Sequence, residues 1–186
     1  MSSVKKTCIC AFCTALCCVL PMAFHALALG PAFSPMHLPI LLCGLVCGWP
    51  YGAFCGVAGP VLSSCFSGMP AAAQLIYMVP ELCAYGLFTG LLMNCIRTGR
   101  TLPDLYLSLT AAMVLGRVAG GAARALFYLS HAESYSIALW AGAYFVQTAP
   151  GAVLQIAAIP PLVLLLTRAG LIPAHYGKPA FQEPGG

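Results

Sequence analysis

The sequence predicts an all-α membrane protein, a bundle of six transmembrane helices with both termini in the cytoplasm. The chain has 186 residues, 61% of them apolar and only 6% charged, and its mean hydropathy is +0.92. Residues 7–80 contain no Lys, Arg, Asp or Glu, a stretch too long for the core of a soluble domain. At roughly 20 residues per span, the length accommodates about six helices. We therefore expect one domain over residues 1–170 and an irregular cytoplasmic tail over residues 171–186.

The first three spans are expected in the uncharged part of the chain. Breaks rich in Pro and Gly separate three apolar runs, which cover Thr7–Leu29, His37–Gly48 and Pro50–Ser67. Lys5, Lys6 and the run after them also resemble a secretory signal that ends at residues 26–28. We expect this run to remain as a span, because it is longer than a usual signal core and the topology requires it. The second run is short, which tilting or shielding by neighbouring protein would explain.

Three further spans follow a turn at residues 67–70, and they are expected at Ala71–Ile96, Leu105–Ser130 and Tyr135–Thr167. Basic residues lie at the ends of spans, at Lys5, Lys6, Arg97, Arg100, Arg168 and Lys178. With six spans they all fall on one side of the membrane, which the positive-inside rule assigns to the cytoplasm. They thus indicate topology rather than a nucleic-acid partner. The loops at residues 30–36, 67–70 and 131–134 then face outward and are candidates for the mouth of a binding site.

The few polar side chains within the predicted spans are the candidates for that site. Glu81 lies in an apolar run, and a charge at membrane depth costs about 3 kcal/mol or more, so such residues are usually functional. Counting inward from the outer ends of the predicted helices at about 1.5 Å per residue gives the depth of each polar side chain. Four of them fall in the outer to middle part of the bilayer: Glu81, Arg117, Arg124 and Gln147. We predict a substrate site formed by Glu81, Arg117, Arg124, Gln147, Gln155, Tyr85 and His37. Tyr77, Tyr128 and Tyr144 are close enough in sequence to contribute to its lining.

Two arginines and one carboxylate suggest what the site holds. Arg117 and Arg124 are seven residues apart and project from nearly the same face of their helix. Pairing with one of them would relieve the cost of burying Glu81, and such a pair could be purely structural. Because the arginines outnumber the carboxylate, a guanidinium could also bind an anionic ligand bidentately.

Most of the other motifs favour packing. The eleven cysteines lie mostly within apolar runs, as small reduced hydrophobic residues do. Cys10 and Cys13 form a C-x-x-C motif, but no second pair or nearby His completes a metal site. Glycines recur four residues apart at residues 52 and 56, 86 and 90, and 116 and 120, a spacing typical of close helix packing.

Signatures of an enzyme are missing from the sequence. It contains no H-E-x-x-H, G-x-S-x-G or phosphate-binding G-x-x-x-x-G-K-[ST] motif. Asp104 is the only aspartate and is expected in a loop, which excludes an intramembrane aspartyl mechanism. We therefore expect neither catalysis nor a cofactor in this chain, and any ATP-driven function must use ATPase subunits on other chains.

Short motifs along the chain resemble, in order and spacing, those of the substrate-binding S component of energy-coupling factor (ECF) vitamin transporters. They are PMHLPILL at 35–42, GWPYG at 48–52, GPVLSS at 59–64, SGMP at 67–70, ELCAYGL at 81–87, LGRV at 115–118, PGAVLQ at 150–155 and Ile-Pro at 159–160. The resemblance implies a multi-pass subunit of a prokaryotic cell membrane that captures a small vitamin from outside. It also implies two kinds of partner, a transmembrane T component and two ATPase subunits that use ATP.

The same resemblance assigns roles to particular residues. Ala11 and Ala15 match the A-x-x-x-A pattern through which the first helix of such proteins contacts the T component, although the cysteines around them depart from the usual aliphatic pattern. The chain looks most similar to the pantothenate branch, whose anionic ligand would suit an arginine together with Gln147 and Gln155. The alternatives are a stand-alone, proton-coupled carrier that uses Glu81 as its titrating group, and, less favoured, a membrane-embedded enzyme.

Overall fold

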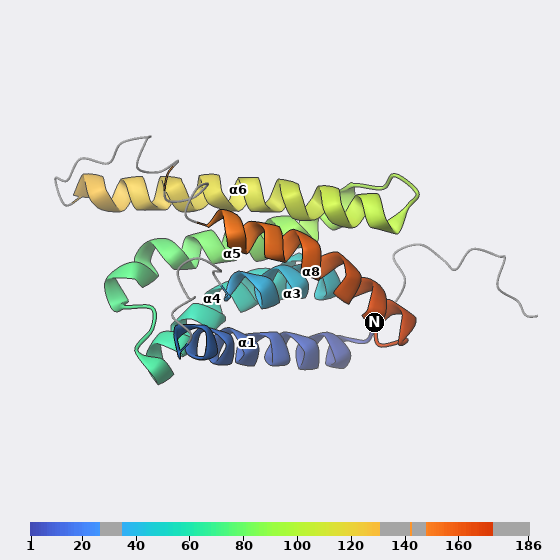
Figure 1. Ribbon diagram of the computed structural model, residues 1–186, viewed down its shortest axis with the longest axis horizontal. Coiled ribbons are helices and arrows are strands. Elements are labelled where there is room, and N and C mark those ends of the chain that lie inside the picture. Colours follow the sequence, from blue (N-terminus) through green and yellow to red (C-terminus); the bar gives the residue numbers. More distant parts are fainter. Residues whose placement is uncertain (27–34, 131–141, 143–147, 173–186) are drawn as a thin grey trace, which may run out of the picture.

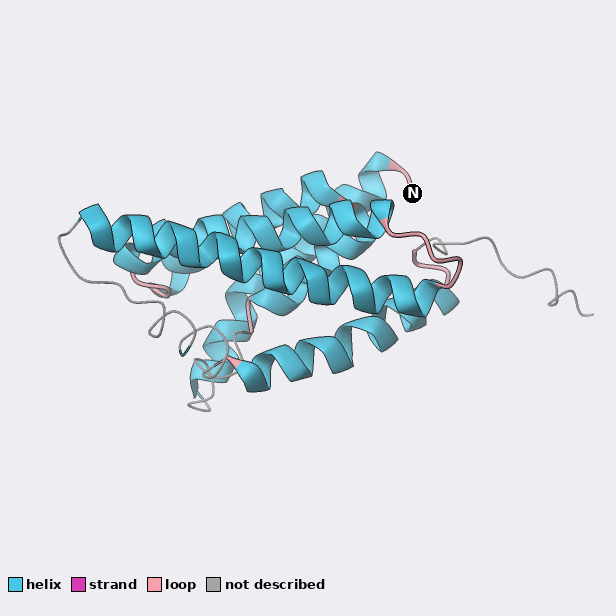
Figure 2. Cartoon of the chain, turned by 90° about the horizontal axis from the view of Figure 1, so that it is seen from above, coloured by secondary structure: helices cyan, strands magenta, loops and turns pink. Residues whose placement is uncertain are grey.

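The computed structural model describes residues 1–26, 35–130, 142 and 148–172 of the chain (Figure 1). Its elements are α1 (Ser3–Ala26), α3 (His37–Cys47), α4 (Trp49–Ser67), α5 (Ala72–Cys95), α6 (Thr101–Ser130) and α8 (Ala149–Arg168). Figure 2 shows helices and loops but no strand in this described part. The predicted all-α class is confirmed.

Helix lengths and exposed side chains both suit a bilayer. Four helices, α1, α5, α6 and α8, are long and apolar enough to cross a membrane, and α3 is a shorter apolar helix. Large apolar side chains such as Phe12, Phe54, Phe66 and Leu126 point away from the bundle with more than 60% of their surface exposed. Large apolar side chains exposed on several helices suit lipid rather than water around them. The cytoplasmic location of both termini stays a prediction.

Several helix boundaries differ from the predicted ones; α1, for example, begins at Ser3 and not at Thr7. Helix α6 begins at Thr101, so Asp104 lies in its first turn and not in a loop. There the Asp104 carboxylate accepts hydrogen bonds from the backbone N–H (3.0 Å) and the hydroxyl (2.5 Å) of Thr98, which fixes the connection from α5.

The sixth predicted span is also wrong as one continuous helix, because Thr148 is a turn residue and α8 starts at Ala149. Pro150 explains the start, since proline lacks the N–H that the first turn leaves unused. Of the remaining predicted range, 135–141 and 143–147 lie outside the described residues.

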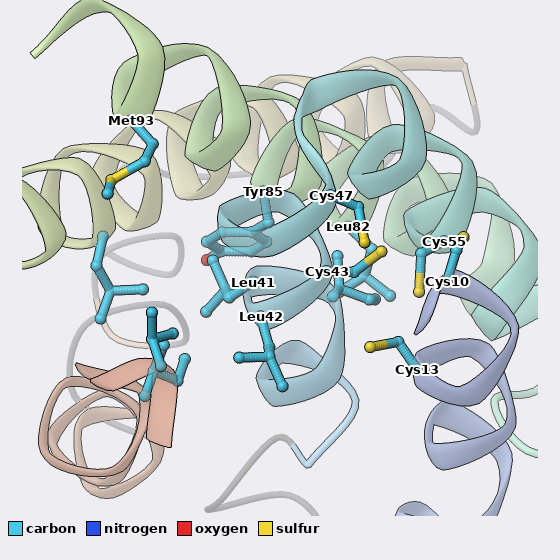
Figure 3. Packing of buried hydrophobic residues seen from close by; sticks show 14 of the residues in the cluster. Cys10, Cys13, Leu41, Leu42, Cys43, Cys47, Cys55, Leu82, Tyr85 and Met93 are labelled. Carbon is cyan, nitrogen blue, oxygen red and sulfur yellow. The ribbon is translucent and has the colours of Figure 1, made fainter. Parts of the chain in front are cut away.

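The helices pack in a defined order around α5. Helix α5 contacts α6 on one side and both α3 and α4 on the other, while α1 packs on α3 and α4 away from α6 (Figure 1). Helix α8 contacts α3 and α6. The buried core in the middle of this arrangement contains Tyr85, Leu41, Leu82 and a group of cysteine side chains (Figure 3). Ile172 belongs to the same core with 7% exposure, so the chain packs against the bundle slightly beyond residue 170.

Glycines allow the central helices to approach closely, as their spacing predicted. A Cβ atom added to Gly44 would lie 2.6 Å from the Gly86 carbonyl oxygen, and one added to Gly86 would overlap the backbone of Gly52. Helices α3, α4 and α5 therefore meet backbone to backbone at these three glycines. At the turn between α3 and α4, Gly48 has a φ of 93°, a conformation that favours glycine.

Candidate functional site

The interface of α5 and α6 places the predicted site residues in a simple antiparallel register. A Cβ added to Gly116 would lie 2.6 Å from Tyr85 Cδ1, and one added to Gly120 would lie 2.7 Å from Glu81 Cγ. One turn farther along α6, the Arg124 guanidinium lies 4.8 Å from the ring centroid of Tyr77. Each step of four residues back along α5 thus matches a step of four forward along α6. The glycines form notches in α6 that receive Tyr85 and Glu81.

Glu81 is buried among aromatic and apolar groups, with 8% of the residue exposed. Its Oε1 atom lies 3.7 Å from Nε2 of His37, a contact that becomes an ion pair when the imidazole is protonated. The His37 ring in turn packs edge-on against Tyr85, with centroids 4.8 Å apart and an interplanar angle of 72°. Three predicted site residues, from α3 and α5, are therefore in direct contact.

His37 is the first residue of α3, and this explains why α3 is short. Glu81 lies nine residues into α5, or about 13 Å from the start of that helix. Because His37 contacts Glu81, α3 must begin at that depth inside the bundle and not at its outer edge. The amino-terminal end of α3 therefore lies beside the Glu81 carboxylate.

The two arginines lie on the same stripe of α6 as Gly120, three residues before it and four residues after it. Arg117 is half-buried and donates a hydrogen bond from Nη2 to the hydroxyl of Thr148 (3.3 Å), the residue before α8. Arg124 faces two tyrosines, Tyr77 at 4.8 Å and Tyr128 at 5.9 Å from its guanidinium carbon. Cation–π contacts of this kind hold a guanidinium in place without using its hydrogen bonds.

The remaining predicted residues are placed less directly. Gln155 is buried, with 3% exposure, two turns into α8 from Thr148. Gln147 lies outside the described residues. The ion pair that the structure records for Glu81 involves His37, and the pairing of Glu81 with Arg117 or Arg124 stays a prediction. A hollow of about 480 Å³ lies away from these residues, where the start of the chain meets the segment after α8. It is lined by Met1, Ser2 and Lys5 and by Gly170–Ile172.

Sequence reasoning missed two features of this site. The first is Thr148, whose contact with Arg117 depends on how α6 and α8 pack. The second is that Gly116 and Gly120 form notches that receive Tyr85 and Glu81. The four-residue spacing of these glycines, next to Arg117, is the sequence signal that could have indicated this role. Together, a carboxylate, two guanidinium groups, an imidazole and tyrosines at membrane depth suit the binding of a small polar molecule.

On α1, the predicted partner-contact residues face outward. Ala11 and Ala15 are exposed, whereas Cys10, Cys13 and Cys17 on the other side of the helix are buried against the bundle. The two alanines thus form a smooth, accessible stripe on which another helix could pack closely.

Comparison with protein families gives a match over most of the chain. The model of the family described as "ECF transporter, substrate-specific component" matches residues 5–163, which is most of the chain. Searches of curated proteins and of solved structures find nothing similar to the chain.

The matched span begins in α1 and ends in α8, so it includes the whole candidate site. Components of this family are multi-pass subunits of prokaryotic cell membranes that bind a substrate and work with a T component and ATPases, and they are not enzymes. On this match, over far more than half of its length, the chain belongs to the family of substrate-specific components of ECF transporters.

Proposed function

We propose that this component captures a small anionic micronutrient, with pantothenate as the candidate, between α3, α5, α6 and α8. The observation that supports the proposal best is the α5–α6 register, which places Glu81 opposite Gly120 with Arg117 and Arg124 on the same stripe of α6. In the described part of this interface, two guanidinium groups accompany one carboxylate. That balance favours a ligand with a negative charge.

Pantothenate offers groups that complement these side chains. Its carboxylate would bind one guanidinium through two parallel hydrogen bonds. Its hydroxyl and amide groups would bind Gln147 and Gln155, and the Glu81–His37 pair can both accept and donate hydrogen bonds. Tyr85 would supply an apolar surface beside the ligand.

Mass spectrometry of the small molecule that copurifies with the detergent-solubilised protein tests the proposal. We expect pantothenate, and we expect heat on titration of the emptied protein with pantothenate. Binding of a neutral pyrimidine, with no heat from pantothenate, would show that the ligand class is wrong.

For the transport step, we expect uptake only when the T component and ATPases are present. Uptake that persists without an ATPase and disappears with the proton gradient would favour a stand-alone carrier.

Gly120→Ala probes the notch that receives Glu81. The added methyl would lie within 2.8 Å of three Glu81 side-chain carbons, so the carboxylate must move away from α6. We expect affinity for pantothenate to fall about tenfold or more, because a displacement of this size separates charge-assisted hydrogen bonds from their partners. Gly142→Ala is the matched control, since a Cβ there meets nothing within 4 Å. Equal affinity of both variants would contradict the assignment.

We also propose that the stripe of Ala11 and Ala15 contacts the T component. Both residues are exposed, so leucines there should leave the isolated protein folded. Close packing of a partner helix needs small residues, and the double change to leucine should abolish copurification with the T component and ATPases. Ala122→Leu, at an exposed position on α6, should leave the complex intact. Retention of the complex by the α1 variant would place the contact elsewhere.

A further inference from the structure

The proposed function leaves a dense group of buried cysteines unused. Six thiols from three helices gather where α1 meets α3 and α4, and each residue is 4% exposed or less. They are Cys10, Cys13 and Cys17 of α1, Cys43 and Cys47 of α3, and Cys55 of α4. Figure 3 shows five of them with their sulfur atoms directed into the space between these helices. In the described residues, no group of three or more His, Cys, Asp or Glu side chains is arranged to hold a metal ion.

Within this group, two contacts between α1 and α4 bring Cys17 and Cys55 into neighbouring positions. The hydroxyl of Thr14, one turn before Cys17, lies 3.6 Å from Sγ of Cys55. A Cβ added to Gly59, one turn after Cys55, would lie 2.9 Å from Cβ and 3.0 Å from Sγ of Cys17.

These contacts show that α1 and α4 approach closely at this point because Gly59 has no side chain. A disulfide needs such an approach, since its two Cα atoms usually lie about 4.4–6.8 Å apart. Both cysteines belong to the same buried hydrophobic cluster. Unlike this pair, the thiols of Cys65 and Cys95 near the ends of α4 and α5 are exposed.

We propose that Cys17 and Cys55 form a redox-active pair that a hydroperoxide converts into a disulfide between α1 and α4. In the first step one thiol attacks the O–O bond of hydrogen peroxide, giving a sulfenic acid and one water. In the second step the other thiol displaces the sulfenic hydroxyl as water and forms the S–S bond. Together the two thiols lose two protons and two electrons, and the peroxide is reduced to two waters. The bond fastens the helix that carries Ala11 and Ala15 to the rest of the bundle.

Thiol counting on the full-length protein in detergent tests this assignment without any ligand or partner. The protein is treated with hydrogen peroxide, denatured, alkylated and digested, and the peptides are mapped by mass spectrometry. We expect two fewer alkylated thiols than the eleven of the sequence, and a crosslinked peptide, two hydrogens lighter, that joins Cys17 to Cys55. A reductant should restore all the thiols.

Variants separate this pair from the other cysteines. Cys17→Ala and Cys55→Ala should each lose the crosslink, whereas Cys65→Ala and Cys95→Ala, at exposed positions, should retain it. Because the wild-type map alone identifies the bond, poor folding of a variant would not decide the question. Full alkylation after peroxide, a disulfide between any other two cysteines, or oxidation only at exposed thiols would overturn the proposal. None of these results depends on the identity of the transported substrate.

Discussion

Replacing Gly86 with valine is expected to lower the free energy of unfolding by at least about 3 kcal/mol, the upper end of the cost of overpacking. The reason is that the added side chain would overlap the backbone of Gly52, and backbone atoms cannot rotate away as a side chain can. Helix α4 would have to move away from α5. Because Gly44 also packs against the Gly86 carbonyl oxygen, α3 would lose its contact at the same point.

Thermal unfolding in detergent measures this effect. For a protein of this size, a loss of about 3 kcal/mol lowers the Tm by about 6–12 °C. Gly86→Ala, with a smaller side chain, should give a smaller decrease and covers the case in which the valine variant does not accumulate. Gly142→Val is the control, because a Cβ at that position meets nothing within 4 Å. Equal Tm values for the Gly86 and Gly142 variants would show that the close approach of α4 and α5 is not rigid.

The same glycines show how much of the fold could be predicted from the sequence. Apolar runs and the breaks between them predicted the helices to within a few residues, except for the start of α8 at Ala149. The length of a span and the positions of Pro and Gly are local properties, which a sequence shows directly. The four-residue glycine spacing predicted close packing, which the structure confirms at Gly52 and Gly86. Which helices meet at these glycines is a tertiary property that spacing alone cannot give.

The site was predicted less completely, for the same reason. Glu81 and the arginines could be selected because charges within apolar runs are rare and costly. The contact of Glu81 with His37 could not be predicted, because it depends on α3 beginning inside the bundle. The short length of α3 is compatible with such a start but does not require it. The contact of Arg117 with Thr148 depends likewise on the packing of α6 against α8.

Arg117→Ala is expected to lower the affinity for pantothenate by about tenfold to a hundredfold. This range corresponds to the loss of a hydrogen bond that involves a charged group, about 1.5–3 kcal/mol. The expectation rests on the position of Arg117 on the same stripe of α6 as Gly120, whose notch holds Glu81. Isothermal titration of the purified variant with pantothenate gives the affinity, and Arg97→Ala, exposed after α5, is the matched control.

Arg117 also holds Thr148 at the start of α8, so its loss could weaken binding by moving α8 alone. Thr148→Val separates the two effects, because it removes the acceptor at 3.3 Å and keeps the guanidinium. If Arg117 binds the ligand, Thr148→Val should retain most of the affinity. Arg117→Lys should then recover only part of it, since an ammonium keeps the charge but cannot form two parallel hydrogen bonds to a carboxylate. Equal losses in Arg117→Ala and Thr148→Val would instead assign Arg117 to the positioning of α8, and full affinity in both Arg117→Ala and Arg124→Ala would remove the arginines from the site.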